Sequence, residues 1–338
     1  MSEVNERKYT LVTVFYEDEY ELLLLQARSM RIYASAEIIE KMLIIDNSER
    51  PLPRGWKTRI LSEYGRLSGL VEIVDSRDIA RPPWATGWKT QQILKLMASH
   101  IVATERYLVL DSKNHLVFPL TREALEASDG RPRTHLHSYF DHPLRRHLER
   151  ALDYYGLERA QHVAQFTATA TPFVIYTEIA RKMIVDLSNR EGRRFELAFT
   201  KCKLTEFFAY ACFVINDRRD LAALYDFHQP ATPCIWEHTA TRSGCQETVA
   251  QALAQRSPFF ALHRPAIAKL DTDARKVVAG FWSARSLFET SERADTFLAE
   301  LQLKSRKKSW SRPLWRALKA FDSLWGSHPK PPAPYRVA

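Results

Sequence analysis

Apolar runs alternate with helix-like segments through the first third of the chain, and this alternation restricts the fold more than any other feature. The apolar runs cover residues 9–16, 41–47, 70–76 and 106–111. Segments 17–34 and 86–102, between these runs, carry apolar residues at the spacing of amphipathic helices. Strands separated by helices favour a mixed, mostly parallel sheet flanked by helices. The sequence therefore predicts a Rossmann-like α/β fold.

Polar residues lie at the carboxyl ends of the predicted strands. Asp46, Asp75 and Asp111 end the last three strands, and Thr13 lies near the end of the first. Because the carboxyl ends of parallel strands meet at one edge of a sheet, ligands commonly bind just beyond that edge. We therefore expect Thr13, Asp46 and Asp111 to face a ligand.

The second half of the chain is less regular, but three segments place candidate residues. Residues 203–216 predict a helix with Glu206 near its start. Residues 257–265 predict a strand ending at His263, which Pro265 prevents from continuing. A helix follows over 271–289, capped by Asp271 or Thr272.

Net charge and cysteine usage limit the functional class. A formal charge of +9 and a pI near 9.3 favour anionic partners: nucleic acid, acidic lipid or phosphorylated ligands. Nucleic acid is the least expected, since no helix-turn-helix, RNP or zinc motif accompanies the charge. The four cysteines form no CxxC pair, and no apolar run reaches the roughly 20 residues of a membrane span. These features favour a cytoplasmic protein.

The end of the chain has a different composition. Seven lysine and arginine residues and three tryptophans lie within residues 304–325. A helix from about Ser311 would place Leu314, Leu318 and Trp325 on one face and Arg316 and Lys319 on the other. Residues 291–338 therefore predict a basic amphipathic C-terminal extension, which either binds an anionic membrane surface or forms a solvated helix; the distribution of tryptophan and charge favours the membrane.

Three segments carry a resemblance to a known fold family. They are "MLIIDNSE" (42–49), "GWKTQQILKLMASHIVATERYLVLDSKNHLV" (87–117) and "LTEFFAY" (204–210). These resemble nucleotide-sugar glycosyltransferases of the GT-A fold, above all a bacterial family of uncharacterised GT-A-like proteins. The resemblance implies a GT-A-like domain over residues 8–290. It also implies transfer of a sugar from a nucleotide-sugar donor to a hydroxyl of a surface glycan or lipid-linked acceptor.

The same resemblance implies roles for individual residues. Asp46 would contact the nucleoside of the donor, and Lys95 and Asp111 would contact its diphosphate. Glu206 would be the catalytic carboxylate: in an inverting transfer it takes the proton of the acceptor hydroxyl, and in a retaining transfer it would be the carboxylate on the nucleophile side of the donor. His263 would supply a further metal or phosphate ligand, with His238 as its rival.

One position departs from the GT-A pattern. These enzymes usually end the fourth strand in Asp-x-Asp, whose last carboxylate holds a divalent metal, but here Lys113 takes that place. Either Lys113 itself neutralises a donor phosphate, or Asp111, Asn114 and His263 hold Mn²⁺ or Mg²⁺ while Lys113 points away. The alternation of side chains along a strand favours the second arrangement. Lys113 also leaves open a non-catalytic glycan- or nucleotide-binding protein on the same scaffold.

Overall fold

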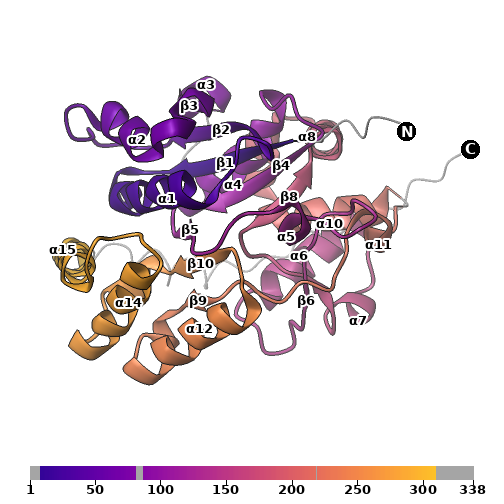
Figure 1. Ribbon diagram of the computed structural model, residues 1–338. Helices are drawn as coiled ribbons and strands as arrows, with labels where there is room; N and C mark the ends of the chain where they lie inside the picture. Colours follow the sequence, from indigo (N-terminus) through magenta and orange to yellow (C-terminus); the bar gives the residue numbers. More distant parts are fainter. Residues whose placement is uncertain (1–7, 81–86, 218, 310–338) are drawn as a thin grey trace, which may run out of the picture.

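Five strands form the central sheet of this computed structural model, which describes residues 8–80, 87–217 and 219–309 (Figure 1). Their order is β3-β2-β1-β4-β8. They span Tyr9–Phe15 (β1), Ile39–Asp46 (β2), Val71–Asp75 (β3), Arg106–Asp111 (β4) and Phe173–Tyr176 (β8). The first four strands are parallel, and β8 pairs antiparallel with β4. The predicted mixed, mostly parallel sheet is confirmed.

Alternate residues of the strands enter two different hydrophobic clusters. In β1, all seven residues are buried; Leu11 packs in one cluster, and Val12 and Val14 in the other. This is the two-residue period of a strand with both faces covered. It explains why the strands are continuously apolar in sequence.

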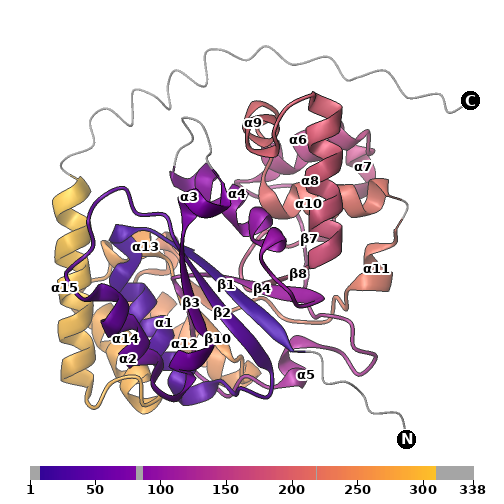
Figure 2. The same cartoon turned by 90° about the horizontal axis from the view of Figure 1, so that it is seen from above.

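Helices cover both faces of the sheet. One face carries α1 (Tyr20–Tyr33) and α2 (Trp56–Tyr64). The other carries α4 (Gly87–Met97), α6 (Arg145–Tyr155), α8 (Thr177–Glu191), α9 (Phe195–Lys201) and α10 (Glu206–Asn216). Figure 2 shows α6, α8, α9 and α10 gathered beyond α4, near β8.

A second layer packs on the outer side of α1. Its three-stranded sheet has the order β5-β10-β9, with strands Asn114–Leu116 (β5), Cys234–Ile235 (β9) and Phe259–Leu262 (β10). Helices α12 (Arg242–Gln255), α14 (Thr272–Ala284) and α15 (Ser291–Ser309) complete this layer. Asp271, one of the two expected caps of α14, accepts a hydrogen bond from the Ala274 N–H. The helix ends at Ala284, five residues before its predicted end.

The remaining elements are short. They are α3 (Ser76–Ile79), α5 (Arg122–Leu125), α7 (Arg159–His162), α11 (Leu221–Leu224), α13 (Arg264–Ile267), β6 (Leu136–His137), β7 (Phe166–Thr167) and the 3-10 turns η1 (Glu17–Glu19), η2 (Gly65–Leu70), η3 (Ala98–His100) and η4 (Glu237–Thr239). No helix in the described part of the chain has both the length and the apolar character needed to cross a membrane.

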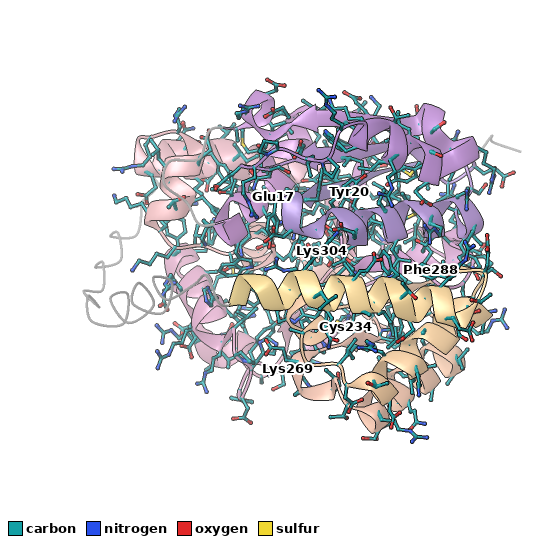
Figure 3. All side chains as sticks on the ribbon, turned by 90° about the vertical axis from the view of Figure 1, so that its left-hand side faces the viewer. Glu17, Tyr20, Cys234, Lys269, Phe288 and Lys304 are labelled. Atoms are coloured by element: carbon teal, nitrogen blue, oxygen red, sulfur yellow. The ribbon has the colours of Figure 1, made fainter. Side chains whose placement is uncertain are left out.

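Helix α15 joins the start of the predicted C-terminal extension to the rest of the molecule. Its Ala294 and Leu298 are fully buried in the hydrophobic cluster of the second layer. Lys304 pairs with Glu21 of α1, and Figure 3 shows Lys304 near the start of that helix. Residues 291–309 therefore pack against the body of the protein. The helix expected from Ser311 lies outside the described residues.

We predict that Leu298→Ala destabilises the protein by about 2–5 kcal/mol, because it removes a buried side chain and leaves a cavity. Leu303→Ala on the same helix is the matched control. Leu303 is 59% exposed, so its loss should change the free energy of unfolding by no more than about 0.5 kcal/mol. Urea unfolding of both variants measures the difference. Equal stabilities would contradict the packing of α15.

Candidate functional site

The topology of the sheet places the candidate site between β1 and β4. From β1 the chain moves outward through β2 and β3, and it then returns to place β4 on the opposite side of β1. Ligands of open α/β sheets bind beyond the strand ends at such a reversal of direction. Asp111, the last residue of β4, lies there, level with Val14 of β1.

The Asp111 carboxylate lies between two ammonium groups. Its Oδ1 accepts a hydrogen bond from Lys95 Nζ (2.6 Å), and its Oδ2 lies 2.8 Å from Lys113 Nζ. Oδ2 also accepts from the Thr171 hydroxyl (2.9 Å). Burial raises the pKa of Asp111, but the two lysines outweigh burial and hold that pKa well below its usual range. Asp111 is therefore ionised at neutral pH.

Lys95 connects Asp111 to Glu206. Its Nζ lies 3.4 Å from Glu206 Oε1, and the side chains of Lys95 and Glu206 are each 7% exposed. Burial raises the pKa of Glu206, and Lys95 opposes that shift. Glu206 Oε2 is buried without a hydrogen-bond partner. The structure thus brings four predicted residues together as one group, the Asp111 cluster: Lys95, Asp111, Lys113 and Glu206.

Asn114 and Thr13 support the turn after β4 from inside the protein. Asn114 Oδ1 accepts the backbone N–H of Asp111 (2.8 Å), and Asn114 is fully buried. Gln26 Nε2 donates to the carbonyls of Asp111 and Asn114, each at 2.9 Å. The Thr13 hydroxyl donates to Gln26 Oε1 (3.0 Å), and Thr13 is 1% exposed. Direct contact of Thr13 or Asn114 with a donor or metal therefore does not match this geometry.

The side chains around Asp111 do not fit a divalent metal. Both carboxylate oxygens already bind cationic or hydroxyl groups, and Lys113 points toward Asp111 instead of away from it. Within residues 8–80, 87–217 and 219–309, no group of three or more histidine, cysteine or acidic side chains has a geometry that could hold a metal. The arrangement therefore differs from the metal site that strand alternation favoured.

His263 lies near Lys113, on the second layer. Its ring is 4.8 Å from the ring of Trp236, and Lys113 Nζ is 5.4 Å from that same indole. Burial, then the charge of Lys113, lowers the pKa of His263 to about 4. His263 is therefore neutral at pH 7 beside a lysine. Its rival, His238, is exposed on η4.

Asp46 ends β2, and β1 separates it from Asp111 on β4. It lies level with Phe15 of β1 and with Asp75 of β3. Its Oδ1 accepts the backbone N–H of Ser48 (2.9 Å), and the residue is partly exposed. Asp46 therefore shares the strand-end edge of the sheet with Asp111, as expected, without joining the cluster.

Glu19 is a site residue that the sequence analysis missed. Its Oε2 accepts hydrogen bonds from Ser112 Oγ (3.1 Å) and Gln91 Nε2 (3.2 Å). Burial and then the charge of Asp111 raise the pKa of Glu19 to about 7. The available signal is the run of three acidic residues, 17–19, one residue after β1; in the sequence it predicts only the start of a helix.

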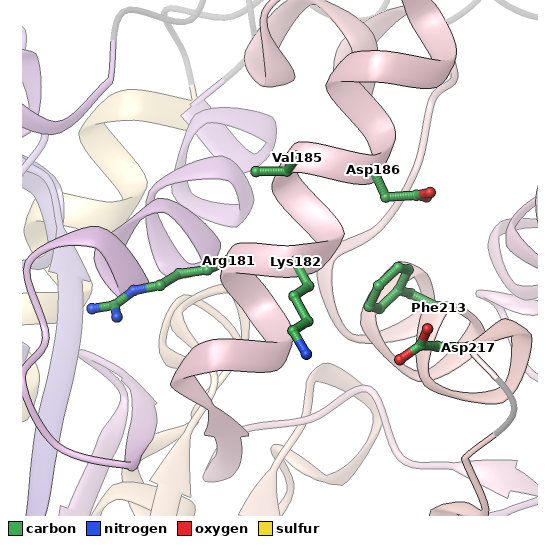
Figure 4. Close-up of a pocket in the computed structure, with 6 residues that line it drawn as sticks. All are labelled: Arg181, Lys182, Val185, Asp186, Phe213 and Asp217. Carbon is green, nitrogen blue, oxygen red and sulfur yellow. The ribbon is translucent and has the colours of Figure 1, made fainter.

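A surface hollow of about 420 Å³ lies apart from the cluster, between α8 and α10 (Figure 4). Arg181, Lys182, Val185, Asp186, Phe213 and Asp217 line it. Figure 4 shows Arg181 directed away from Phe213 and Asp217, and its guanidinium donates to the carbonyls of Ser99 and Val102. No residue of the Asp111 cluster contributes to this hollow.

We predict that protonation of His115, next to the turn of the site, destabilises the protein in acid. His115 Nε2 accepts from Trp282 Nε1 (2.9 Å), so its proton is on Nδ1, which faces the Lys113 carbonyl (3.3 Å). Burial lowers the pKa of His115 to about 4, whereas an unfolded histidine has a pKa near 6.5. The unfolded chain therefore binds the proton first. About 3 kcal/mol of stability should be lost as the pH falls from about 6.5 to 4.

The free energy of unfolding as a function of pH measures this loss. His115→Gln should reduce the pH dependence, since its amide oxygen accepts from Trp282 without titrating. His238→Gln, at an exposed position, is the control. An unchanged slope in His115→Gln would contradict the assignment.

Comparisons with known proteins give a family and several similar folds. The similar structures include the galactosyltransferase LgtC in complex with donor and acceptor sugar analogues (12% identity, 86% of this chain and 95% of that chain, TM-score 0.46). They also include the bifunctional glycosyltransferase WbbM, at 10% identity over 86% of this chain and 52% of that chain, with a TM-score of 0.45. A further one is the glycosyltransferase GlyE of Streptococcus pneumoniae TIGR4, at 13% identity over 88% of this chain and 64% of that chain, with a TM-score of 0.40. These values are too low to transfer an activity. No curated protein matches the chain. The profile of a family of unknown function (DUF6492) matches residues 9–242, and the chain belongs to that family.

Proposed function

We propose that this protein is a glycosyltransferase that uses lysine in place of a metal at the donor diphosphate. It would transfer a sugar from a nucleotide-sugar donor to a hydroxyl of a glycan or lipid-linked acceptor. The observation that supports this proposal is the Asp111 cluster at the strand reversal, with two lysines around one carboxylate and Glu206 beside them. Asp46, at the end of β2 on the other side of β1, would contact the nucleoside.

Lys113 has the exposure and the charge for a diphosphate. Its side chain is 19% exposed, compared with 7% for Lys95. An ammonium group carries three hydrogen-bond donors, and Asp111 needs only one of them. The remaining donors would bind the phosphate oxygens and stabilise the negative charge that develops as the diphosphate leaves.

Glu206 would act as the base in an inverting transfer. The acceptor oxygen attacks the anomeric carbon, the bond from that carbon to the diphosphate oxygen breaks, and the hydroxyl proton passes to Glu206. A raised pKa suits this task, since a carboxylate with a pKa closer to neutral accepts a proton more effectively. Lys95 would hold Glu206 in place and keep it ionised before the transfer.

The burial of Glu206 favours one alternative, a non-catalytic protein that binds a nucleotide or glycan. At 7% exposure, the Glu206 side chain has limited access to an acceptor hydroxyl. Binding and turnover therefore have to be measured separately.

We predict that one nucleotide sugar stabilises the protein in a thermal-shift panel of UDP-, GDP-, CMP- and dTDP-sugars. The shift should be the same with Mn²⁺ and with EDTA, because Lys113 replaces the metal. Lys113→Met should weaken donor affinity about tenfold or more, the loss of one charge-assisted contact of about 1.5–3 kcal/mol. Lys269→Met is the control, since Lys269 is 58% exposed and pairs with Glu237 on the second layer. No shift with any donor, or a shift only with Mn²⁺, would contradict this proposal.

The Glu206→Gln variant tests whether the protein is a glycosyltransferase or a non-catalytic binding protein. The variant should keep the thermal shift of the donor and lose sugar transfer at least a hundredfold, the usual scale of general-base catalysis. Undiminished transfer would remove the catalytic assignment. A wild-type protein that binds donor and transfers nothing to any acceptor tested would support the alternative.

The basic C-terminal residues would bring the enzyme to a membrane that carries the acceptor. Lys304 pairs with Glu21 of α1, the helix that follows the carboxyl end of β1, so α15 reaches the edge of the sheet that holds the site. The sequence after residue 309 contains three tryptophans and further cationic residues. Each cation near an anionic surface contributes about 1 kcal/mol.

We predict that a chain truncated after Ser309 loses its binding to vesicles that contain phosphatidylglycerol. This truncation keeps α15 intact. Full-length protein with pure phosphatidylcholine vesicles is the control, and cosedimentation measures the bound fraction. Equal binding of the full-length and truncated chains would rule out this role of the tail.

A further inference from the structure

The N-terminal turn of α4 presents an exposed aromatic ring beside the Asp111 cluster. Trp88 is 47% exposed, although it belongs to a helix whose following turns are buried. Trp88, Gln92 and Lys95 recur at helical spacing along one stripe of α4. Lys95 follows Trp88 by seven positions, so the Cα atoms of the two residues lie about 10 Å apart along the helix axis.

The Trp88 ring is held by residues that also contact the start of α10. His147 of α6 packs edge-on against the indole, with ring centroids 5.6 Å apart. His147 Nδ1 lies 3.1 Å from Thr205 Oγ1, and Thr205 directly precedes Glu206. Lys89 Nζ lies 5.4 Å from the Trp88 ring and donates to the carbonyl of Leu204. The exposed ring and the proposed base are therefore tied to the same short segment.

Two buried polar atoms on these elements have no hydrogen-bond partner: Gln92 Nε2 and Glu206 Oε2. Gln92 is 1% exposed and Glu206 is 5% exposed. One is a donor and the other an acceptor, and leaving such atoms unpaired costs about 1–3 kcal/mol each. A sugar hydroxyl can both donate and accept, so it offers a partner to either kind of atom.

We propose that Trp88, Gln92 and Glu206 form the acceptor-sugar subsite of the proposed transferase. The C–H face of a pyranose ring packs on the indole, whose π-face carries partial negative charge. A hydroxyl of the sugar reaches toward Gln92 and Glu206. The donor diphosphate lies on the other side of Glu206, at Lys113, so the base stands between the two substrates. This inference rests on the proposed function, and it adds the substrate class and the residues that bind the acceptor.

Saturation-transfer NMR with simple glycosides tests the subsite. The probes are methyl β-D-glucopyranoside, methyl β-D-galactopyranoside and N-acetylglucosamine, each with full-length protein. At least one glycoside should receive saturation at its ring protons, and Trp88→Ala should reduce this signal at least fivefold. Trp88→Phe should retain part of the signal, since the smaller ring still offers an aromatic face. Thermal unfolding of each variant verifies that the fold is intact.

Leu253→Ala is the control, because Leu253 is 49% exposed on α12 of the second layer and contacts no residue of the Asp111 cluster. Loss of the glycoside signal in Leu253→Ala but not in Trp88→Ala overturns the subsite, as does the absence of any signal in the wild type. Donor binding separates the two proposals. A wild type that binds a nucleotide sugar, with glycoside signals unchanged by Trp88→Ala, disproves the subsite and leaves the transferase standing. Glycoside binding that depends on Trp88 without binding of any donor supports the carbohydrate subsite and disproves the transferase.

Discussion

The Asp111 carboxylate between the ammonium groups of Lys95 and Lys113 is the interaction on which the rest of the site depends. Moving a charged group out of water costs several kcal/mol, and two close partners with good geometry offset that cost here. Lys95 repeats the pairing with Glu206. Loss of Lys95 would leave two poorly hydrated carboxylates facing each other with less compensation. The cluster is therefore a connected unit, and the position of each charge depends on the others.

The backbone around Asp111 is fixed by contacts with the sheet, with α1 and with the second layer. Gln26 of α1 binds two carbonyls of the turn, and Thr13 of β1 orients Gln26. His115 connects the turn to Trp282 of α14. Buried hydrogen bonds of this kind hold a charged group in one geometry before any ligand arrives. Thr13 and Asn114 thus serve the site as supports.

Local patterns were sufficient for the four parallel strands and for Asp111 at the end of β4, whereas Lys95 and Glu206 were predicted from the family resemblance. Continuous apolar runs indicated buried strands, and their polar ends indicated where Asp46 and Asp111 lie. The direction of Lys113 depends on the turn and on the neighbouring Trp236, which local alternation does not describe. The role of Glu19 depends on contacts with Ser112 and Gln91, across two other elements. The sequence predicts that Thr13 faces a ligand, because it does not reveal that Gln26, 13 residues later, binds the Thr13 hydroxyl.

The signs of the charges around Asp111 favour an anionic ligand there over a divalent metal. At an effective dielectric constant of about 20, two unit charges 4 Å apart interact by about 4 kcal/mol. A divalent cation at that distance from either lysine would meet about 8 kcal/mol of repulsion, and Asp111 is already shared between both lysines. A phosphate oxygen in the same place is attracted instead. Because burial also raises the pKa of Glu19 to about 7, that carboxyl group opposes an incoming diphosphate less than a fully ionised carboxylate would. The two lysines that make a metal unfavourable therefore favour an anionic ligand.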